Sequence, residues 1–529
     1  MQWVLSRPSR SVWICGLAGL SLAAVSTIAG SFPPAEVHDE LAYLLAGDTF
    51  ADGRVSYPTH PMWRHFETFH VLMQPTYVSK YPPAQGLAIA LGQRLTGTPI
   101  VGIWISCALL VATLNWMLQA WTRRRWAFWG AIAAALWISG WHTRGYWTTS
   151  FWGGSVAAFG GALVLGGIRR LASAPTVSAS IAVGVGLAVL ANSRPLEGLL
   201  FSLPAMAMVA WVLFRQLRVK NWRFATITIA PMALVLALTG ALMGLYNFKT
   251  TGSATQPPYL AYDKEYAFWP NLVGQDQPPP PVYRVAVIEQ FFKKGTAPPP
   301  QNFRQYAGRL RENASRLVEF YAPWFIVPLL FVLPLTLRGL WMKVALASVV
   351  TTGIALALNL FFLQPHYAAP LAAAWCLLLT QAARFASHLR LNRARSGRVL
   401  VRVMMACLLG SVFIRIGVSR LFLSNRKTTW PWQRQSMERS LSRNGEHLII
   451  VEYGPMHSPN KEWVYNRGNI DAAPVVWARS IGEPEDAALR QYFATRRAWR
   501  LRIDNDSGPF KLMPLEGDTS DSIRQAVRP

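Results

Sequence analysis

Long apolar runs recur along the 529-residue chain, and they constrain its fold more than any other feature. A helix needs about twenty apolar residues to cross the roughly 30 Å hydrocarbon core of a bilayer, and many runs approach that length. Charged residues make up only 15% of the chain, whereas soluble domains carry about 25%. The pattern predicts an all-α polytopic membrane bundle of about eleven transmembrane helices. The candidate spans are residues 12–30, 100–121, 126–141, 147–168, 178–191, 196–214, 225–246, 321–337, 344–363, 367–382 and 399–418.

The net charge of +26 is informative through its distribution. A basic chain can bind nucleic acid, but here Lys and Arg gather at the ends of the apolar runs, as membrane orientation requires, so no nucleic-acid partner is expected. The apolar segment 85–95 is too short to span. If it lies on the outer surface, every basic connector between spans falls on one side. This arrangement predicts a cytoplasmic N-terminus and an outer C-terminus.

Three regions then face outward, and they divide the chain into its expected parts. A transmembrane part, 1–420, carries a first outer loop with interfacial helices and a second outer loop, and a small soluble α/β domain follows on the outer face. The first apolar run is interpreted as an uncleaved helix. The outer loops are residues 31–99 and 247–320, the domain is 421–529, its strands are expected at 447–453, 474–478 and 499–503, and its helix at 483–495.

Two adjacent carboxylates, Asp39 and Glu40, lie a few residues beyond the first apolar run. They precede a helix-prone stretch, so Asp39 has two interpretations. It is either an N-cap that accepts the free N–H groups of that helix, or a general base at the membrane surface. Neighbouring basic groups in the same loop favour the second interpretation.

The first outer loop resembles the C-type glycosyltransferases (GT-C), and within them the protein O-mannosyltransferases and the lipid A aminoarabinose transferases. The resemblance covers this loop and, loosely, the number of spans. It rests on Asp39-Glu40, Tyr43, Ala46-Gly47-Asp48, Gly53-Arg54 and Lys80-Tyr81-Pro82-Pro83.

The resemblance implies a polyprenyl-phosphate sugar as donor and inversion at the anomeric carbon. It implies Asp39 as the base, with Glu40 as second choice, and Lys80 as a ligand of the donor phosphate. Two positions depart from the pattern. Tyr81 is inserted between the Lys and the two prolines, and Ser79 stands where relatives often carry Glu. An acidic metal ligand is therefore not carried over to position 79.

Three further residues at predicted outer turns are candidates for the donor phosphate. Arg194 either binds that phosphate or pairs with Glu197 to close its turn. Arg144 lies among aromatic residues that are typical of an interfacial belt. His366 begins a late span, where it either lines a cavity or lies at the interface.

A loose cluster of titratable residues in the first loop raises the question of a metal. Helical spacing within the cluster makes a metal site conceivable. The interleaved aromatic residues favour an amphipathic interfacial helix whose polar groups face water, and we adopt that interpretation. No metal ligand is assigned, although a divalent metal remains compatible with the chemistry. The cluster is His60, His65, Glu67 and His70.

These observations predict a glycosyltransferase of the plasma (inner) membrane that moves a sugar from a polyprenyl-phosphate donor to a glycan, lipid or protein hydroxyl on the outer face. The alternative is a transporter or flippase of lipid-linked sugars, which would show repeats, broken helices and ionisable groups near the midplane. A third possibility is a non-catalytic assembly subunit. Because the polar residues gather in outer loops, the enzyme is favoured.

Overall fold

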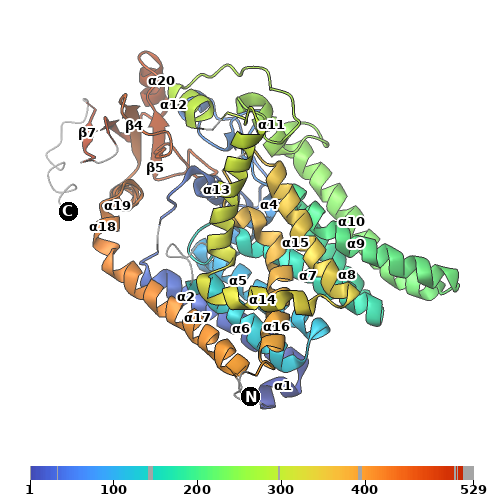
Figure 1. Cartoon of the computed structure of the whole chain (residues 1–529). Helices are drawn as coiled ribbons and strands as arrows, with labels where there is room; N and C mark the ends of the chain where they lie inside the picture. The colour runs from blue at the N-terminus through green and yellow to red at the C-terminus, as the bar shows by residue number, and fades with distance from the viewer. Residues whose placement is uncertain are drawn as a thin grey trace.

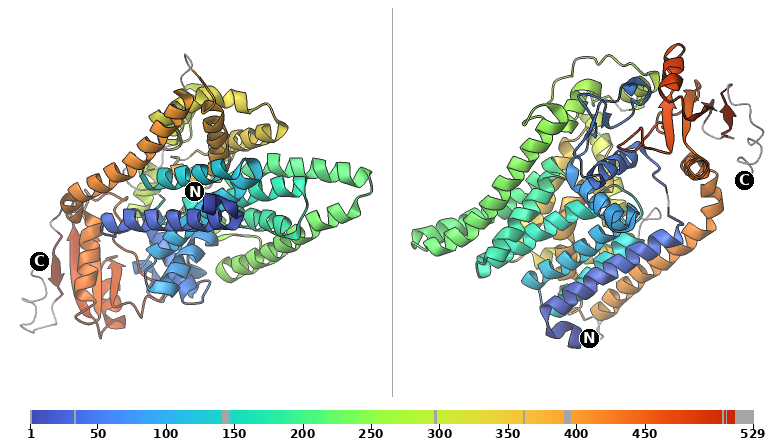
Figure 2. Two further views of the ribbon diagram at one scale, coloured as in Figure 1. Left: turned by 90° about the horizontal axis from the view of Figure 1, so that it is seen from below. Right: turned by 180° about the vertical axis from the view of Figure 1, so that it is seen from behind.

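The computed structural model describes residues 2–32, 34–140, 147–295, 298–360, 362–390, 396–505, 508 and 510–515. Its body is a bundle of helices, and irregular loops, short helices and strands cover one end of that bundle (Figure 1). The N-terminus lies at the opposite end, while the C-terminal sheet lies beside the loops (Figure 2). We call the end covered by loops the loop end. We call the opposite end the basic end, because it holds the N-terminus and arginines such as Arg123, Arg170 and Arg398.

Eight apolar helical stretches of the described chain are long enough to cross a membrane. A bent pair, α13 (Phe303–Tyr321) and η3–α14 (Trp324–Thr336), makes a ninth if its two arms, 76° apart, form one span. Two predicted spans are occupied by the shorter helices α6 (Arg124–Gly140) and α8 (Val177–Ala191). The polytopic helical bundle is confirmed, while the total of eleven and the orientation of the termini stay predictions. The eight are α2 (Pro8–Ala29), α5 (Ile100–Trp121), α7 (Gly154–Ser173), α9 (Pro195–Arg218), α10 (Trp222–Thr251), α15 (Leu340–Leu358), Pro365–Ala386 (η4 and α16) and α17 (Ser396–Leu421).

Helix α7 lies inside the bundle, and its glycines set how closely its neighbours approach. A Cβ atom on Gly160 would lie 3.0 Å from the carbonyl oxygen of Gly186 in α8. A Cβ atom on Gly161 would lie 2.5 Å from the carbonyl oxygen of Pro370 in η4 (Pro365–Leu371). Small residues allow such close packing between membrane helices. They therefore fix the position of η4, which carries His366.

The two loops that the sequence predicts to face outward build most of the loop end. In the first, α3 packs on α4, and Gly86 leaves room for Ala46 and Phe50 of α3. A small antiparallel sheet of order β1-β3-β2 follows the turn after α3. Helices are thus present in this loop and α4 falls outside the candidate spans, while their interfacial position stays a prediction. The elements are α3 (His38–Ala51), β1 (Tyr57–Pro58), η1 (Trp63–His65), β2 (Val71–Leu72), β3 (Thr76–Ser79) and α4 (Pro83–Thr96), and in the second loop α11 (Pro258–Tyr266), α12 (Ala286–Gln290) and η2 (Phe291–Gly295).

One expectation for the first loop is wrong. Residues 60–70 do not form an amphipathic helix with polar groups toward water, because the segment consists of a single 3-10 turn and extended chain. The side chains of His60, His65, Glu67 and His70 are all buried, with 1–8% exposed. The second loop and the C-terminal region cover them, so the aromatic residues of this segment pack against protein.

The C-terminal region contains a four-stranded sheet of order β5-β4-β6-β7. Strand β4 pairs in parallel with β5 and β6, and the antiparallel β7 forms one edge. All three predicted strands and the predicted helix are present. Leu448 and Ile450 of β4 share a hydrophobic core with Ala42 and Leu45 of α3, so this sheet packs directly on the first outer loop. The elements are α18 (Leu423–Lys427), α19 (Trp430–Leu441), β4 (His447–Tyr453), β5 (Val475–Arg479), α20 (Glu485–Tyr492), β6 (Arg497–Ile503) and β7 (Leu512–Pro514).

Candidate active site

Asp39 lies in the first turn of α3, where its carboxylate faces side chains of the first loop. The Tyr81 hydroxyl donates a hydrogen bond to Oδ1. Oδ2 lies 3.5 Å from Nδ1 of His38 and 3.7 Å from Nε2 of His70. The N-cap residue of α3 is Val37, and no side chain caps this helix. Asp39 is therefore not used as a helix cap, and 29% of its side chain stays exposed.

The surroundings of Asp39 keep its carboxyl group ionised. Burial by itself raises the pKa of a carboxyl group, because it disfavours the charged form. The imidazoles of His70 and His38 and the hydrogen bond from Tyr81 outweigh that effect and hold the pKa of Asp39 well below its usual value. An ionised carboxylate with partial access to solvent has the state that a general base requires.

Lys80 provides a cation close to Asp39. Its Nζ lies 4.7 Å from the ring centroid of Tyr262, in the second loop, and 5.4 Å from that of Tyr81. Burial lowers the pKa of Lys80, while the carboxylates of Asp263 and Asp39 raise it. The backbone N–H of Lys80 donates to the carbonyl of His70, and the N–H of His70 donates to the Tyr262 hydroxyl. The first and second loops thus meet around Lys80.

Arg194 reaches the same cluster from the turn between α8 and α9. The N–H of Ala84 donates to the carbonyl of Asn192 at 3.0 Å, which joins this turn to the chain just after Lys80. The guanidinium lies 4.3 Å from the ring centroid of Tyr367. No ion pair to Glu197 is present among the described residues. Glu197 is nevertheless near enough to act on the guanidinium electrostatically, since it is one of the groups that raise the pKa of Arg194.

Tyr43 connects Arg194 with Asp39. Its ring stacks on Tyr81 with centroids 4.3 Å apart. Burial raises the pKa of Tyr43 to about 12, with a further increase from Asp39 and an opposing effect of Arg194. Both charges therefore act on one phenol, which lies in a small aromatic cluster with Tyr81.

The other predicted site residues have different positions. His366, in η4, stacks on Trp152 with ring centroids 5.0 Å apart. It lies next to Tyr367, whose ring is in contact with the Arg194 guanidinium. The structure therefore places His366 at the edge of the cluster. Arg144 lies outside the described residues.

Glu40 has a structural environment that differs from that of Asp39. Its two carboxyl oxygens accept the backbone N–H groups of Glu36 and Phe151, both at 2.9 Å. Burial raises the pKa of Glu40 to about 7, although these two hydrogen bonds lower it. The carboxyl group thus links the start of α3 to Phe151, and each of its oxygens accepts a backbone N–H group.

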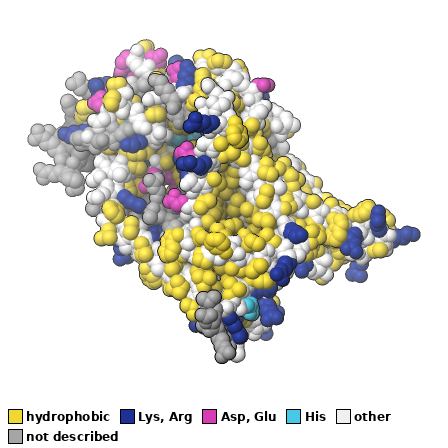
Figure 3. All heavy atoms as spheres, in the orientation of Figure 1, with side chains coloured by type: hydrophobic (Ala, Val, Ile, Leu, Met, Phe, Trp, Pro, Cys, Tyr) yellow, Lys and Arg dark blue, Asp and Glu magenta, His cyan; other side chains and the backbone are white. Residues whose placement is uncertain are grey.

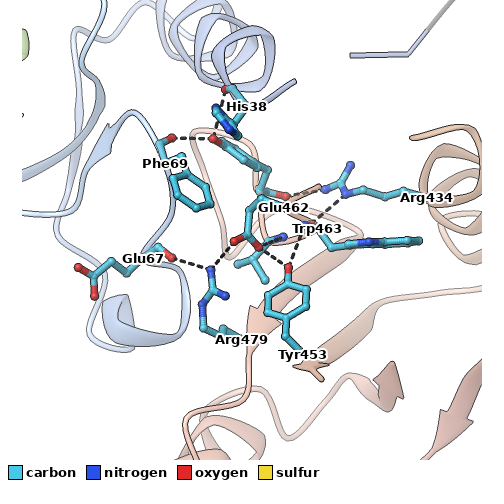
Figure 4. A network of polar contacts seen from close by, with 10 residues as sticks. His38, Glu67, Phe69, Arg434, Tyr453, Glu462, Trp463 and Arg479 are labelled. Atoms are coloured by element: carbon cyan, nitrogen blue, oxygen red, sulfur yellow. Dashed lines mark hydrogen bonds and ion pairs between the residues drawn. The ribbon is translucent and has the colours of Figure 1, made fainter. Parts of the chain in front are cut away.

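The C-terminal region supports the site from behind. The Tyr465 hydroxyl lies within hydrogen-bonding distance of the carbonyl oxygens of Phe69, at 2.6 Å, and His38, at 3.2 Å. Figure 4 shows this contact beside a buried ion pair in which Arg479 donates to Glu462 at 2.7 Å. The same arginine donates to the carbonyl of Glu67. The segment that carries His70 is therefore held by residues about 400 positions away in the sequence.

The second loop joins this support through Glu67. Its Oε1 accepts the hydroxyl of Tyr266 at 2.7 Å and the guanidinium of Arg284 at 3.1 Å. The Glu67 side chain is almost fully buried, and a charge in that environment is tolerated only with such partners. Loop one, loop two and the C-terminal region are consequently joined by polar contacts as well as by packing.

Three groups of the site lie close enough to share a cation. One ligand atom each from His38, Asp39 and His70 falls within 4.8 Å of the others. Two imidazoles and a carboxylate suit zinc and other divalent transition metals. The two imidazoles also hydrogen-bond each other directly at 2.9 Å, whereas the buried Nδ1 of His70 has no hydrogen-bond partner among the described residues.

An apolar groove of about 620 Å³ opens beside the charged cluster. Helices α8, α9 and α10 form its walls, with the segments around Pro82 and Tyr259 at its upper part. Pro82 and Asn192 in its lining are each two residues from Lys80 and Arg194, respectively. The groove therefore runs along the membrane helices toward the two cations.

Sequence reasoning missed several residues that shape the site. Tyr81, treated only as an insertion, donates to Asp39, and His70, assigned to a water-facing helix, lies against it. Tyr262 and Tyr465 come from distant regions and carried no local signal. The position of Tyr81 between Lys80 and two prolines was the one signal that could have placed it in the site. An aromatic residue inserted in a short motif needs a packing partner.

The bundle, in which the C-terminal region covers the loop that carries Asp39 and Lys80, is similar in fold to a solved structure of ArnT, so the predicted resemblance is confirmed at the level of fold. The crystal structure of apo ArnT from Cupriavidus metallidurans matches with a TM-score of 0.51 and 12% identity over 92% of each chain.

Two other solved structures are similar at lower scores. ArnT from the same organism bound to undecaprenyl phosphate gives a TM-score of 0.48, with 13% identity over 92% of each chain. The Archaeoglobus fulgidus oligosaccharyltransferase in complex with Zn and sulfate gives 0.49, with 11% identity over 93% of this chain and 67% of that chain. No family model and no curated protein matches the sequence.

Proposed function

We propose that this protein is an inverting glycosyltransferase that moves a sugar from a polyprenyl-phosphate donor to a hydroxyl acceptor at the outer face of the membrane. The observation that carries the proposal is the juxtaposition of an ionised, partly exposed Asp39 with the cations Lys80 and Arg194 at the end of an apolar groove. A base, an anion site and a lipid-compatible groove are what this reaction needs.

The donor fits this layout through its two chemically distinct parts. Its isoprenoid chain is apolar and matches the groove between α8, α9 and α10. Its phosphate is anionic and matches Lys80 and Arg194, since guanidinium and ammonium groups form strong charge-assisted hydrogen bonds with phosphate. His366 lies close enough to the Arg194 turn to contact the same headgroup. The sugar then projects from the membrane toward Asp39.

The reaction step assigns one task to each group. The Asp39 carboxylate takes the proton of the acceptor hydroxyl as its oxygen attacks the anomeric carbon. The bond between that carbon and the phosphate oxygen breaks, and its electron pair leaves with the polyprenyl phosphate. Lys80 and Arg194 stabilise the negative charge that grows on the phosphate. Attack opposite the leaving group inverts the anomeric configuration, and Tyr81 keeps Asp39 oriented.

The topology follows from the connectors between helices. Arg residues at the basic end, including Arg123 and Arg398, would lie in the cytoplasm, and the loop end would face outward. We assign residues 421–529 to an outer-face domain and the protein to the plasma membrane of its cell. A Cys introduced at Thr59 should react with an impermeant thiol reagent added from outside, and one at Thr122 should not. The opposite labelling pattern overturns the orientation.

The function is tested with the purified chain in lipid nanodiscs. Candidate polyprenyl-phosphate sugars, labelled in the sugar, are supplied with membrane extract as acceptor. We expect release of polyprenyl phosphate coupled to labelled product, and loss of both in Asp39→Asn. Movement of intact donor across liposomes, without any change in its glycosidic bond, would instead indicate a transporter.

A divalent cation held by His38, Asp39 and His70 is a second arrangement of the same site. It would make Asp39 a metal ligand, and the cation would then assist the leaving group or the acceptor. Extensive treatment with a chelator separates the two arrangements. Full transfer after metal removal supports Asp39 as a free base, whereas loss that Mn²⁺ or Zn²⁺ restores supports the metal.

A further inference from the structure

A second large cavity lies inside the bundle and belongs to the basic end. It has a volume of about 770 Å³ and lies between α6, α14, α16 and α17. None of the residues that form the Asp39 cluster line it. In Figure 1, these four helices meet at the lower part of the molecule, on the side of the N-terminus and far from the C-terminal sheet.

The walls of this cavity are apolar and long. On α6 the lining extends from Arg125 to Trp137, a helical rise of about 18 Å. One leaflet of a bilayer contributes about half of a 30 Å hydrocarbon core. The cavity is therefore long enough for one acyl chain. Its apolar lining includes Trp129, Ala133, Leu379 and Met405.

The mouth of the cavity is strongly basic. Four arginines, Arg123, Arg125, Arg398 and Arg402, line it, and His388 lies with them. No acidic residue occurs in the lining, and none of the four guanidiniums has an ion pair within the part of the chain that the structure describes. Figure 3 shows Lys and Arg gathered beside a His at the lower end of the molecule, below a hydrophobic flank.

We propose that this cavity binds an anionic phospholipid, with one acyl chain along α6 and the headgroup phosphate among the four arginines. The argument is charge complementarity: unpaired guanidiniums at the rim of an apolar cavity match a ligand with an anionic head and a hydrocarbon tail. A zwitterionic lipid supplies the same tail with no net negative charge. The site is independent of the proposed function, because it lies at the other end of the bundle.

Other arginines at the basic end provide a matched comparison. Arg215 and Arg218, at the end of α9, do not line the cavity. Their guanidiniums stack on nearby aromatic rings of the same helix, Trp211 at 4.9 Å and Phe214 at 4.3 Å. They carry the same charge as the cavity arginines but lie outside the cavity, so their substitution measures the effect of general surface charge.

The test is native mass spectrometry of the delipidated full-length protein in detergent, titrated with phosphatidylglycerol or phosphatidylcholine that carry identical chains. We expect phosphatidylglycerol to bind at least about tenfold more tightly. The double variant R398Q/R402Q should lose most of that preference, and R215Q/R218Q should keep it. Ala133→Phe, which fills the cavity, should weaken the binding of both lipids.

Three outcomes overturn the proposal. One is equal affinity for the two lipids in the wild type. Another is an equal effect of the two double variants, which would assign the preference to general surface charge. In the third, polyprenyl phosphate displaces phosphatidylglycerol from the wild-type protein, and the A133F variant no longer shows this displacement. The cavity would then be a binding site for the donor lipid. Each variant is first checked for a single species in size-exclusion chromatography, and A133F tests the cavity without changing charge.

Discussion

The two ends of the membrane bundle use charge in opposite ways. At the loop end, the ionised Asp39 has a phenol and two imidazoles around it, and Lys80 lies over an aromatic ring close to two carboxylates. At the basic end, arginines lie at or near helix ends without carboxylate partners among the described residues. Charges that orient a chain in a membrane need no partners, whereas charges that do chemistry must be positioned.

The largest expected loss of transfer activity distinguishes Asp39 from another acid of the same loop, Glu36. Asp39→Asn removes the proton acceptor and should lower kcat by roughly 10²- to 10⁴-fold, with the protein still folded. Glu36→Gln, an acid-to-amide change in an exposed position three residues earlier, is the control and should retain full activity. The measurement is product formation in nanodiscs at saturating donor. Retained transfer in Asp39→Asn would remove this residue from the mechanism.

The second prediction compares the two ends directly. Arg194→Gln removes one cation from the leaving phosphate and should reduce transfer by about 10²-fold, as the loss of a single electrostatic donor does in other enzymes. Arg215→Gln, at the basic end, should change it less than twofold, or about 0.4 kcal/mol. Both variants are assayed with the same donor. Equal losses would show that arginine content, and not position, sets the rate.

A smaller effect is expected from the support behind the site. Tyr465→Phe removes the donor shared by the carbonyls of Phe69 and His38, and the buried carbonyls then lack a partner at a cost of about 1–3 kcal/mol. We expect kcat to fall by about tenfold with KM for the donor unchanged, because Asp39 and His70 lose their fixed geometry. Tyr492→Phe, in an exposed position of the same region, is the control. A lower thermal stability with unchanged kcat would assign Tyr465 a purely structural role.

The smallest expected effect on transfer belongs to Glu40, whose role should appear in stability. Its pKa of about 7 lies above that of a carboxyl group in an unfolded chain, so the unfolded state loses its proton first as pH rises. The free energy of unfolding should therefore fall between about pH 4.5 and pH 7, and Glu40→Gln should remove this contribution. Thermal melts of both proteins across this range provide the measurement. Parallel melting curves would contradict the assignment, as would a loss of kcat as large as that of Asp39→Asn.

Part of this site was predictable because its signals are local. Asp39 lies a few residues after an apolar run, Lys80 shortly precedes two prolines, and Arg194 stands in a short turn between two runs. Each can be recognised within a few residues. The segment around His60 and His70 was interpreted wrongly for the same reason. Its aromatic spacing fits a membrane surface, and only the folded chain shows that other protein segments cover it.

The sequence by itself determined the membrane bundle, the strands of the C-terminal region and the acid that begins the first outer loop, because hydrophobicity, strand patterning and charge at helix ends act over short stretches of chain. The tertiary structure decided which groups surround that acid. Tyr81 lies 42 residues after Asp39 and donates to it, while Tyr465 reaches the neighbouring His38 across 427 residues. Contacts at such separations arise from packing between elements and leave no periodic pattern in the sequence.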